Sequence, residues 1–329
     1  MLWLEADRLG WLLPTMDKPK VDLQRDVVKN ERRQSYENQP YGLVADHRSK
    51  LVYPVGHPYS WPVIGSMTDL SAASVDDVKD FFRQYYAPNN ATIVVAGDVK
   101  SADVRALVRE YFSEVPRGPV ITRPVPAPFT IRDTAVTLED RVQLARLYLI
   151  FHSVKSADRD AAALQVASYV LTGSRTGRLT QALVFKGEIA TTVQAYDADK
   201  RLDGDYNIVA TARPGLGLDT LQTVIDRNLQ TLSADGPTAR ELDEARNAIE
   251  ASFLRAIQTV SGKADQLNEY YYQTGNPDGF QEDLDKLRAV TAADVQRVVR
   301  TYLQAPRVMI SVVPQGKPQL AATKKPVTP

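Results

Sequence analysis

The chain contains an internal repeat, which limits its possible folds because both copies must build the same kind of unit. Residues 74–98, SVDDVKDFFRQYYAPNNATIVVAGD, recur as residues 291–315, TAADVQRVVRTYLQAPRVMISVVPQ. Asp77 matches Asp294, and Pro88 matches Pro306. Each copy predicts a capped helix, an Ala-Pro break and then a strand. The chain should therefore contain two related domains.

Strand-like and helix-like stretches alternate between the two copies. VTLEDRVQLARLYLIFH at 136–152 and DYNIVATARP at 205–214 have the alternation of strands. Residues 158–171 have the period of a buried helix. This pattern predicts an α+β fold with two homologous α/β-sandwich domains, each a mixed sheet with helices on one face.

The expected domain boundaries lie around a proline-rich stretch. Five prolines fall between residues 116 and 128, and such a composition favours a semi-rigid spacer over packed structure. We therefore predict one domain at residues 1–117, a linker at 118–130 and a second domain at 131–329.

Composition excludes several classes of function. Forty basic and forty acidic residues give a net charge of zero, which argues against nucleic acid or an anionic membrane as the main partner. No apolar run is long enough to span a bilayer. The absence of cysteine excludes disulfides, thiolate catalysis and a cysteine-type zinc site. The 329 residues, 43% of them hydrophobic, are enough for two domains with cores.

One carboxylate occupies an unusual position in the segment VDLQRDVVKNERRQSY at 21–36. Leu23, Val27 and Glu31 are four residues apart, so Glu31 shares an otherwise apolar stripe of the predicted helix. No cation lies three or four residues away on that helix, so a partner for Glu31 must come from elsewhere. Glu31 is either a structural carboxylate paired at a distance or a metal ligand, whereas its neighbours in ERR at 31–33 are expected to be solvated.

Four segments together resemble the pitrilysin/insulinase family of zinc metallopeptidases, the inverzincins. They are QRDVVKNERRQ at 24–34, NQPYG at 38–42, HPYSWPVIGSMTDL at 57–70 and APNNATIVVAGD at 87–98. In that family the glutamate that aligns with Glu31 is the third protein ligand of a catalytic zinc. The other two ligands are the histidines of an upstream HxxEH helix, whose glutamate activates water.

This chain lacks the HxxEH motif, so its first domain is expected to be N-terminally incomplete. Its three histidines, His47, His57 and His152, form neither HxxEH nor a helical i, i+4 pair. Because a catalytic zinc needs three protein ligands, Zn²⁺ is expected in the complete family member and not in this chain alone. His57, flanked by glycine, proline and aromatic residues, is expected to pack in a loop.

A second departure concerns substrate binding. Many family members carry an Arg and a Tyr, spaced as in LRxxxxLxY, that hold the substrate and stabilise the tetrahedral intermediate. Here the aligned residues are Val184 and Thr191, which cannot replace them. Some bacterial relatives divide the zinc motif and the Arg/Tyr pair between two subunits. The resemblance therefore implies a peptide substrate, a homologous partner in a heterodimer or homodimer, and an extracytoplasmic, such as periplasmic, location.

Two functions stay open from the sequence. The chain is either a subunit of a zinc metalloendopeptidase, with Glu31 as a metal ligand, or a non-catalytic structural or binding subunit with a peptidase fold. The repeat favours the first alternative, in which Glu31 is a metal ligand. Glu250 aligns with Glu31 but has Arg246 one turn earlier as its expected ion-pair partner. Glu31 has no such neighbour.

Overall fold

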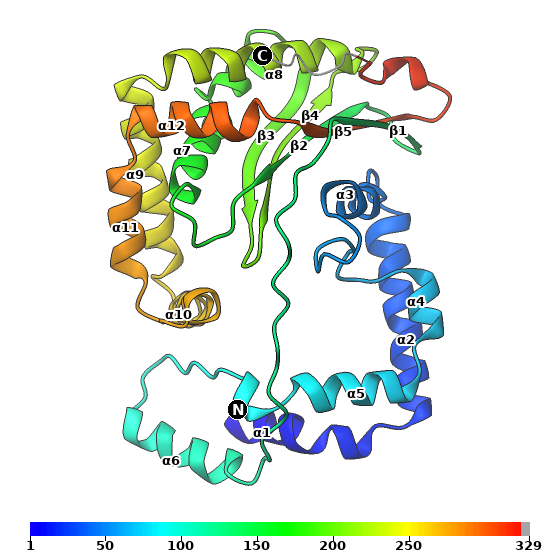
Figure 1. Cartoon of the computed structure of the whole chain (residues 1–329), viewed down its shortest axis with the longest axis vertical. Helices are drawn as coiled ribbons and strands as arrows, with labels where there is room; N and C mark the ends of the chain where they lie inside the picture. The colour runs from blue at the N-terminus through cyan, green and yellow to red at the C-terminus, as the bar shows by residue number, and fades with distance from the viewer. Residues whose placement is uncertain (324–329) are drawn as a thin grey trace. The chain divides into compact units, whose positions relative to one another are not determined.

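The computed structural model describes residues 1–323, which form two compact units (Figure 1). Unit 1 comprises residues 1–38, 62–125 and 256–277, and unit 2 comprises residues 39–61, 126–255 and the described residues from 278 onward. The units therefore do not follow the boundaries expected from the repeat, because each takes a segment from the other half of the sequence. Those domain boundaries stay a prediction.

Unit 1 is helical and forms no strand. Its α-helices are α1 (Leu2–Trp11), α2 (Lys18–Arg32), α4 (Met67–Ala72), α5 (Val75–Tyr85), α6 (Ser101–Phe112) and α10 (Val260–Thr274). Short 3-10 turns lie at Leu13–Thr15 and Pro88–Asn90, and a π-helical turn at Arg33–Glu37 continues α2.

Unit 2 is built on a five-stranded mixed sheet. The strands are β1 (Thr134–Asp140), β2 (Arg146–Ser153), β3 (Ala190–Asp199), β4 (Gly204–Ala212) and β5 (Arg307–Pro314). Their order is β1-β5-β2-β4-β3, with β1 parallel to β5 and the other neighbours antiparallel. The expected α+β class with a mixed sheet is confirmed, and the strands predicted at 136–152 and 205–214 are present.

The helices of unit 2 are α3 (Val44–Val52), α7 (Ala161–Thr172), α8 (Leu218–Asp235), α9 (Ala239–Ala256), α11 (Phe280–Ala289) and α12 (Ala292–Val298). π-helical turns lie at Thr180–Phe185 and Val299–Leu303, and a 3-10 turn lies at Pro318–Leu320. The helix predicted at 158–171 is α7.

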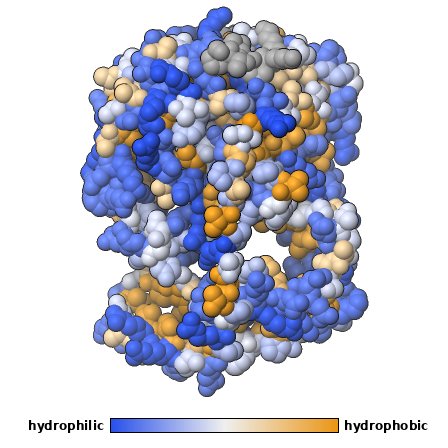
Figure 2. All heavy atoms as spheres, in the orientation of Figure 1, coloured by the Kyte–Doolittle hydropathy of each residue, from blue (hydrophilic) through white to orange (hydrophobic). Residues whose placement is uncertain are grey.

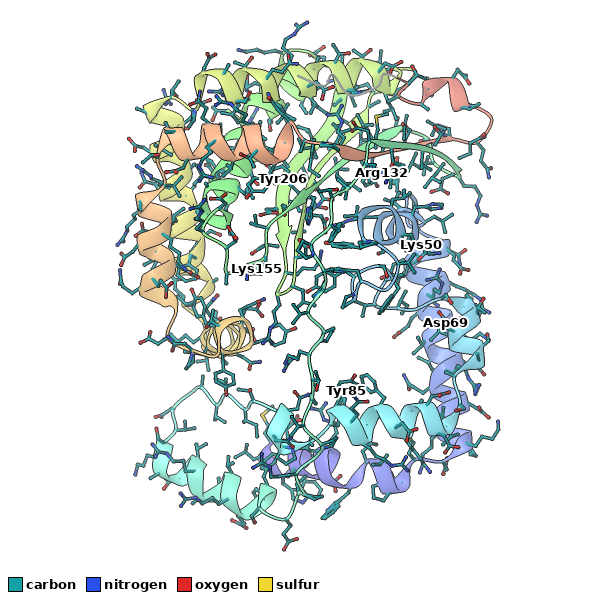
Figure 3. All side chains as sticks on the ribbon, viewed as in Figure 1. Lys50, Asp69, Tyr85, Arg132, Lys155 and Tyr206 are labelled. Carbon is teal, nitrogen blue, oxygen red and sulfur yellow. The ribbon has the colours of Figure 1, made fainter. Side chains whose placement is uncertain are left out.

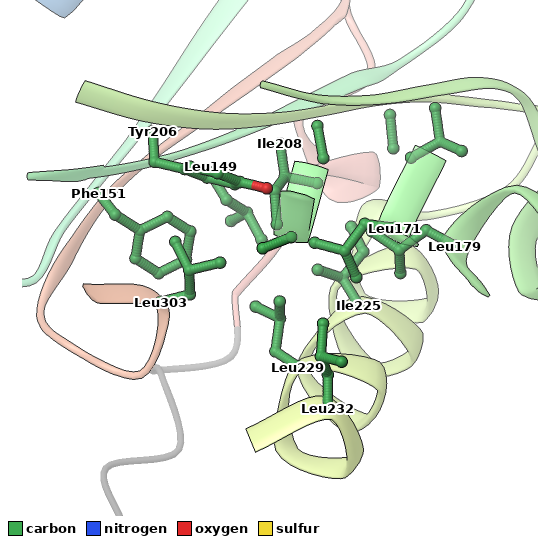
Figure 4. Packing of buried hydrophobic residues seen from close by; sticks show 14 of the residues in the cluster. Leu149, Phe151, Leu171, Leu179, Tyr206, Ile208, Ile225, Leu229, Leu232 and Leu303 are labelled. Atoms are coloured by element: carbon green, nitrogen blue, oxygen red, sulfur yellow. The ribbon is translucent and has the colours of Figure 1, made fainter. Parts of the chain in front are cut away.

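The main core of unit 2 lies between one face of the sheet and the helices α7, α8 and α12. Leu149 and Phe151 on β2 and Ile208 on β4 point into it, toward Ile225 and Leu229 on α8 (Figure 4). Alternate residues of β2 and β4 face this core, as the period of two requires. Burial of these side chains is the main source of the unit's stability.

The two copies of the repeat begin in the same way. Ser74 caps α5 by accepting from the N–H of Asp77, whose carboxylate accepts from the N–H of Ser74 in return. Thr291 and Asp294 form the same reciprocal cap at the start of α12. The matched pair Asp77 and Asp294 is therefore conserved in structural role, since both satisfy N–H groups that a helix start leaves free.

The copies differ after the proline. In the second copy β5 lies between β1 and β2 and is buried along its whole length. In the first copy, residues 91–98 are extended but form no strand, and Ile93 and Val95 are 43% and 40% exposed. Figure 2 shows hydrophobic side chains open to solvent among the helices of unit 1. The strand predicted for the first copy is therefore absent from the structure, because no neighbouring strand pairs with it.

A segment from the first half of the sequence covers part of the second face of the sheet. We call residues 39–61, which include α3, the strap. Val44, Val52 and Tyr53 of the strap pack on Val308 and Ile310 of β5, in a second hydrophobic cluster. The sheet of unit 2 is thus covered on both faces, one by helices and the other in part by the strap.

The edge strand β3 is shielded by a side chain of α7. The Thr172 hydroxyl accepts a hydrogen bond from the N–H of Ala195 at 2.8 Å and lies 3.3 Å from the carbonyl oxygen of the same residue. Both backbone groups of Ala195 on the open edge are therefore satisfied within the chain.

A buried carboxylate lies near the end of β3. Asp197 accepts a hydrogen bond from the Ser153 hydroxyl at 2.6 Å, while its other oxygen is buried without a hydrogen-bond partner among the described residues. Burial raises the pKa of Asp197 to about 7. At neutral pH and above, the folded chain therefore carries the cost of a buried charge.

No helix within residues 1–323 has the length and apolar character needed to cross a membrane.

Hydrogen exchange should distinguish the two copies of the repeat. Amides at 92–97 lack ladder hydrogen bonds and should exchange rapidly, whereas those at 308–313 should exchange only on unfolding of unit 2. Exchange followed by mass spectrometry of the two segments tests this difference. Equal protection of both segments would show that residues 91–98 are paired in solution.

Replacing Asp197 with Asn should stabilise the protein in a pH-dependent way. Because the pKa of Asp197 is higher in the folded than in the unfolded chain, stability should fall as pH rises from about 4 to about 7. Asp197→Asn keeps an acceptor for Ser153 and should raise the free energy of unfolding at about pH 8 by roughly 2–4 kcal/mol, with little effect near pH 4. Urea denaturation at the two pH values measures this. An equal effect at both would be inconsistent with a buried titrating carboxylate.

Candidate functional site

Glu31 lies in the last turn of α2. This helix starts at a cap in which the Asp17 carboxylate accepts from the N–H of Lys20 at 3.0 Å, and Pro19 occupies its first turn. Both features favour a helix start at this position. The helix then runs without a break to Arg32, so the position of Glu31 is set by regular helical geometry.

The stripe expected along α2 is present, but it is not a core face. Leu23 and Val27 are 69% and 41% exposed, and Glu31 is exposed with them. An apolar stripe usually marks the buried face of a helix, but this one faces solvent. Nothing in the described part of the chain forms a hydrogen bond or an ion pair with Glu31, so its carboxylate and two apolar neighbours face outward together.

Arg32, in contrast, is buried and corrects the expectation that ERR is a solvated face. Its guanidinium donates to the carbonyl oxygen of Gly65 at 2.6 Å and lies 3.4 Å from the carboxylate of Glu37. The inward face of α2 therefore carries Val21 and Arg32, and it lies about a quarter of a turn around the helix from Glu31.

Glu31 does not form a metal site with other residues of this chain. Within residues 1–323 there is no group of three or more His, Asp or Glu residues placed to hold a metal ion. A catalytic zinc needs three protein ligands, so the residues present do not fit one. Glu31 as a ligand to zinc stays a prediction that depends on groups from outside this chain.

Glu250, the repeat counterpart of Glu31, is paired. Its partner is Arg288 of α11, with the Arg288 Nε 3.1 Å from a Glu250 oxygen. The prediction that Arg246 pairs with Glu250 is wrong. The Arg246 guanidinium instead donates to the carbonyl oxygen of Val290 and lies 3.6 Å from Asp243. Hydrogen bonding with Arg288 lowers the pKa of Glu250. The contrast with Glu31 holds, although a different arginine produces it.

The two positions that align with the Arg/Tyr pair have no substrate-binding chemistry. Val184 is half-buried on the turn Thr180–Phe185 and packs against the main core. Thr191 is exposed on β3, where its hydroxyl lies 3.3 Å from the carbonyl oxygen of Thr211. Neither side chain places a charged donor in solvent.

Unit 1 contains an open cavity of about 620 Å³. It is lined by the end of α5, where Tyr85 is labelled in Figure 3, by the extended residues 91–94, and by Asp265 and Asn268 of α10. The cavity lies beside the segment that forms no strand, so it exposes backbone groups together with apolar side chains.

Unit 2 brings two histidines together around one aspartate, a grouping that the sequence did not predict. His152 on β2 has its Nε2 2.8 Å from an oxygen of Asp203, and the Nε2 of His57 lies 3.9 Å from the other oxygen. His57 packs in a loop, as expected, against Tyr53 and Phe129. His47 is exposed on α3 and takes no part.

A second carboxylate on the same face anchors the strap. Asp205 on β4 is fully buried and accepts from the hydroxyl of Tyr53 at 2.8 Å and from Lys200 at 2.7 Å, and it is also paired with Arg48 of α3. Burial by itself would raise the pKa of Asp205, but Arg48 and Lys200 outweigh it and lower the pKa to about 2. This cluster therefore holds charge at all ordinary pH values and serves structure.

Two protein sequences show what the chain is similar to. The zinc protease PqqE of Helicobacter pylori is 27% identical over 290 residues, which cover 85% of this chain and 64% of that protein. The mitochondrial-processing peptidase subunit beta of Blastocladiella emersonii is 22% identical over 298 residues, which cover 88% of this chain and 63% of that subunit. The chain thus spans somewhat less than two thirds of the length of these relatives.

The fold is shared with a solved structure. A peptidase M16 inactive domain from Pseudomonas fluorescens superposes with a TM-score of 0.84 at 20% identity, covering 98% of this chain and 76% of that one. Residues 72–249, more than half of the chain, match the family model described as the peptidase M16 inactive domain. With this match, the mixed sheet and the resemblance of its motifs lead to one conclusion: the chain belongs to the peptidase M16 family.

Proposed function

We propose that the chain is a subunit of a zinc-dependent metalloendopeptidase and that Glu31 supplies one ligand to a zinc ion held mainly by an HxxEH motif outside this chain. The observation that carries the proposal is the state of Glu31. It is exposed and has no partner in the described residues, whereas Glu250 at the equivalent position of the second copy is paired with Arg288. A carboxylate with no structural partner is available to a metal.

The relatives support the reaction class. PqqE is called a zinc protease, and this chain spans 64% of its length. Zinc would supply Lewis-acid chemistry to such an assembly. The role of this chain in it would be to hold the Glu31 carboxylate in place on a regular helix.

We further propose a homologous partner subunit that supplies the Arg/Tyr pair. Val184 and Thr191 cannot bind a peptide backbone or a developing oxyanion, so those groups must come from another chain if substrate is to be held. The similarity to a protein that is itself named a subunit, the mitochondrial-processing peptidase subunit beta, supports this division of labour.

A non-catalytic subunit is the second candidate. It is favoured by the lack of any three-residue metal-binding group within residues 1–323 and by the match to a domain described as inactive. Such a subunit would use the same fold for binding or assembly and would not need Glu31.

The chain alone should neither retain zinc nor cleave peptides. After incubation with zinc and desalting, it should carry far less than one zinc per chain, because a single carboxylate has negligible affinity. Metal analysis by mass spectrometry and a fluorogenic unstructured peptide test the two points. Stoichiometric zinc with chelator-sensitive cleavage would contradict the assignment of Glu31 as one ligand of an incomplete set.

A chain extended at its N terminus with an HxxEH-bearing segment tests Glu31 directly. In it, Glu31→Gln should weaken zinc binding by about 10-fold or more, since a metal ligand is lost. Glu250→Gln is the matched control, because it removes an equivalent carboxylate that is bound to Arg288. Equal zinc affinity in the wild-type and Glu31→Gln proteins, both folded by circular dichroism, would favour the non-catalytic alternative.

A further inference from the structure

His57 is a buried histidine whose protonation state is fixed by its contacts. Its side chain is almost fully enclosed, and its Nδ1 accepts a hydrogen bond from the backbone N–H of Tyr59 at 3.0 Å. A nitrogen that accepts a hydrogen bond carries no proton, so the neutral ring must carry its proton on Nε2. That Nε2 is buried without a hydrogen-bond partner among the described residues.

A second proton on His57 would break this arrangement. In the imidazolium both nitrogens are donors, so Nδ1–H would face the N–H of Tyr59. The Tyr59 amide would then lose its acceptor in a partly buried turn, which leaves an N–H group unsatisfied at a cost in free energy. The turn from His57 to Tyr59 is compatible only with the neutral ring.

The surroundings of His57 are mainly apolar. Its ring stacks on Tyr53 at a centroid distance of 4.8 Å and contacts Tyr59 and Phe129 edge-on at 5.2 and 5.5 Å. Besides these tyrosines, three charged or titratable groups face it: Asp203, which would favour a charged ring, and His152 and Lys200, which oppose one. Burial outweighs Asp203 and lowers the pKa of His57.

Asp203 is poorly placed to stabilise a positive charge on His57. One of its oxygens is held by the Nε2 of His152 at 2.8 Å and by the N–H of Gly204 at 2.8 Å. The other oxygen lies 3.9 Å from the Nε2 of His57, beyond hydrogen-bond distance.

We propose that residues 54–61 form an acid-released latch, in which protonation of His57 opens the turn at Tyr59 and detaches this end of the strap from the sheet. Beyond the packing of His57 on Tyr53, the latch is held by a hydrogen bond from the N–H of Leu202 to the hydroxyl of Tyr59 at 3.2 Å. Opening exposes Tyr59, Phe129 and the adjoining sheet surface. Asp205, with its pKa of about 2, stays ionised in this pH range, and its contacts with Arg48 and with the Tyr53 hydroxyl should hold the strap in place from α3 to Tyr53.

The direction of the switch follows from linkage. Because the pKa of His57 is lower in the closed latch than in an open, solvated one, the open form binds more protons. Opening therefore becomes more favourable as pH falls below about 6.5, the ordinary value for histidine. Protonation of Asp197 over the same pH range stabilises the folded unit, so it cannot cause the latch to open at low pH.

The inference does not rest on peptidase activity, because it concerns only the strap and the sheet.

Hydrogen exchange of the full chain at about pH 7.5 and pH 5.0 tests the latch. After correction for intrinsic rates, amides of 54–61 should lose protection about tenfold or more at the lower pH, whereas those of β2 and α7 should not. His57→Asn keeps an acceptor near the Nδ1 position but cannot be protonated, so it should abolish the loss. His47→Gln, at the exposed histidine outside this cluster, is the matched control and should retain it.

Three results would overturn the proposal. The protection of the latch amides could be the same at both pH values in the wild type, or their loss of protection at low pH could persist in folded His57→Asn. The amides of β2 could also lose protection to the same extent, which would indicate global unfolding. If His57→Asn does not fold, nitrogen NMR of histidine-labelled wild-type protein decides, because only three imidazoles are present. His57 should be the Nε2–H tautomer at about pH 7.5 and should take up its second proton in step with loss of protection. A different tautomer, or titration without opening, would also overturn the latch.

Discussion

The arrangement of unit 2 depends on one buried carboxylate. Asp205 lies on the face of β4 away from the main core, where a lone charge would be expensive. Arg48 and Tyr53 reach it from the strap and Lys200 from the end of β3, so a residue of the sheet is satisfied largely by residues far away in the sequence. Without the strap Asp205 would lose two partners, and without Asp205 the strap would keep mainly its apolar contacts. Strap and sheet are therefore mutually dependent.

The local signals in the sequence were sufficient for much of the fold. The capping pairs at Ser74 and Thr291 identified two helix starts, and alternation identified β2 and β4, because each depends on residues close in the chain. The segment 91–98 shows the limit of that reasoning. It has the same strand pattern as β5, but a strand also needs a neighbour, and the neighbour is not encoded in the segment itself.

The sequence identified Glu31 as the candidate site residue but did not predict what surrounds it. Helical spacing placed Glu31 with Leu23 and Val27, and the structure keeps them on one stripe. Burial of the stripe could not be deduced, since it depends on what packs against α2. Arg32 and the Glu250 partner Arg288 were missed for the same reason, because Gly65 and Arg288 lie 33 and 38 residues away from the groups they bind. The cluster around Asp203 joins β2 to the β3–β4 connection and leaves no sequence signal.

The hydroxyl of Thr172 has a consequence for self-assembly. A sheet can be lengthened by a foreign strand only where its edge offers free N–H and C=O groups. At Ala195 both groups are already occupied by Thr172, so a strand docking on β3 would have to displace them and would gain little there. Addition of a strand to this edge, whether in a fibril or in a domain-swapped pair, is therefore disfavoured at the middle of β3. One threonine on a helix thereby protects the centre of an edge strand.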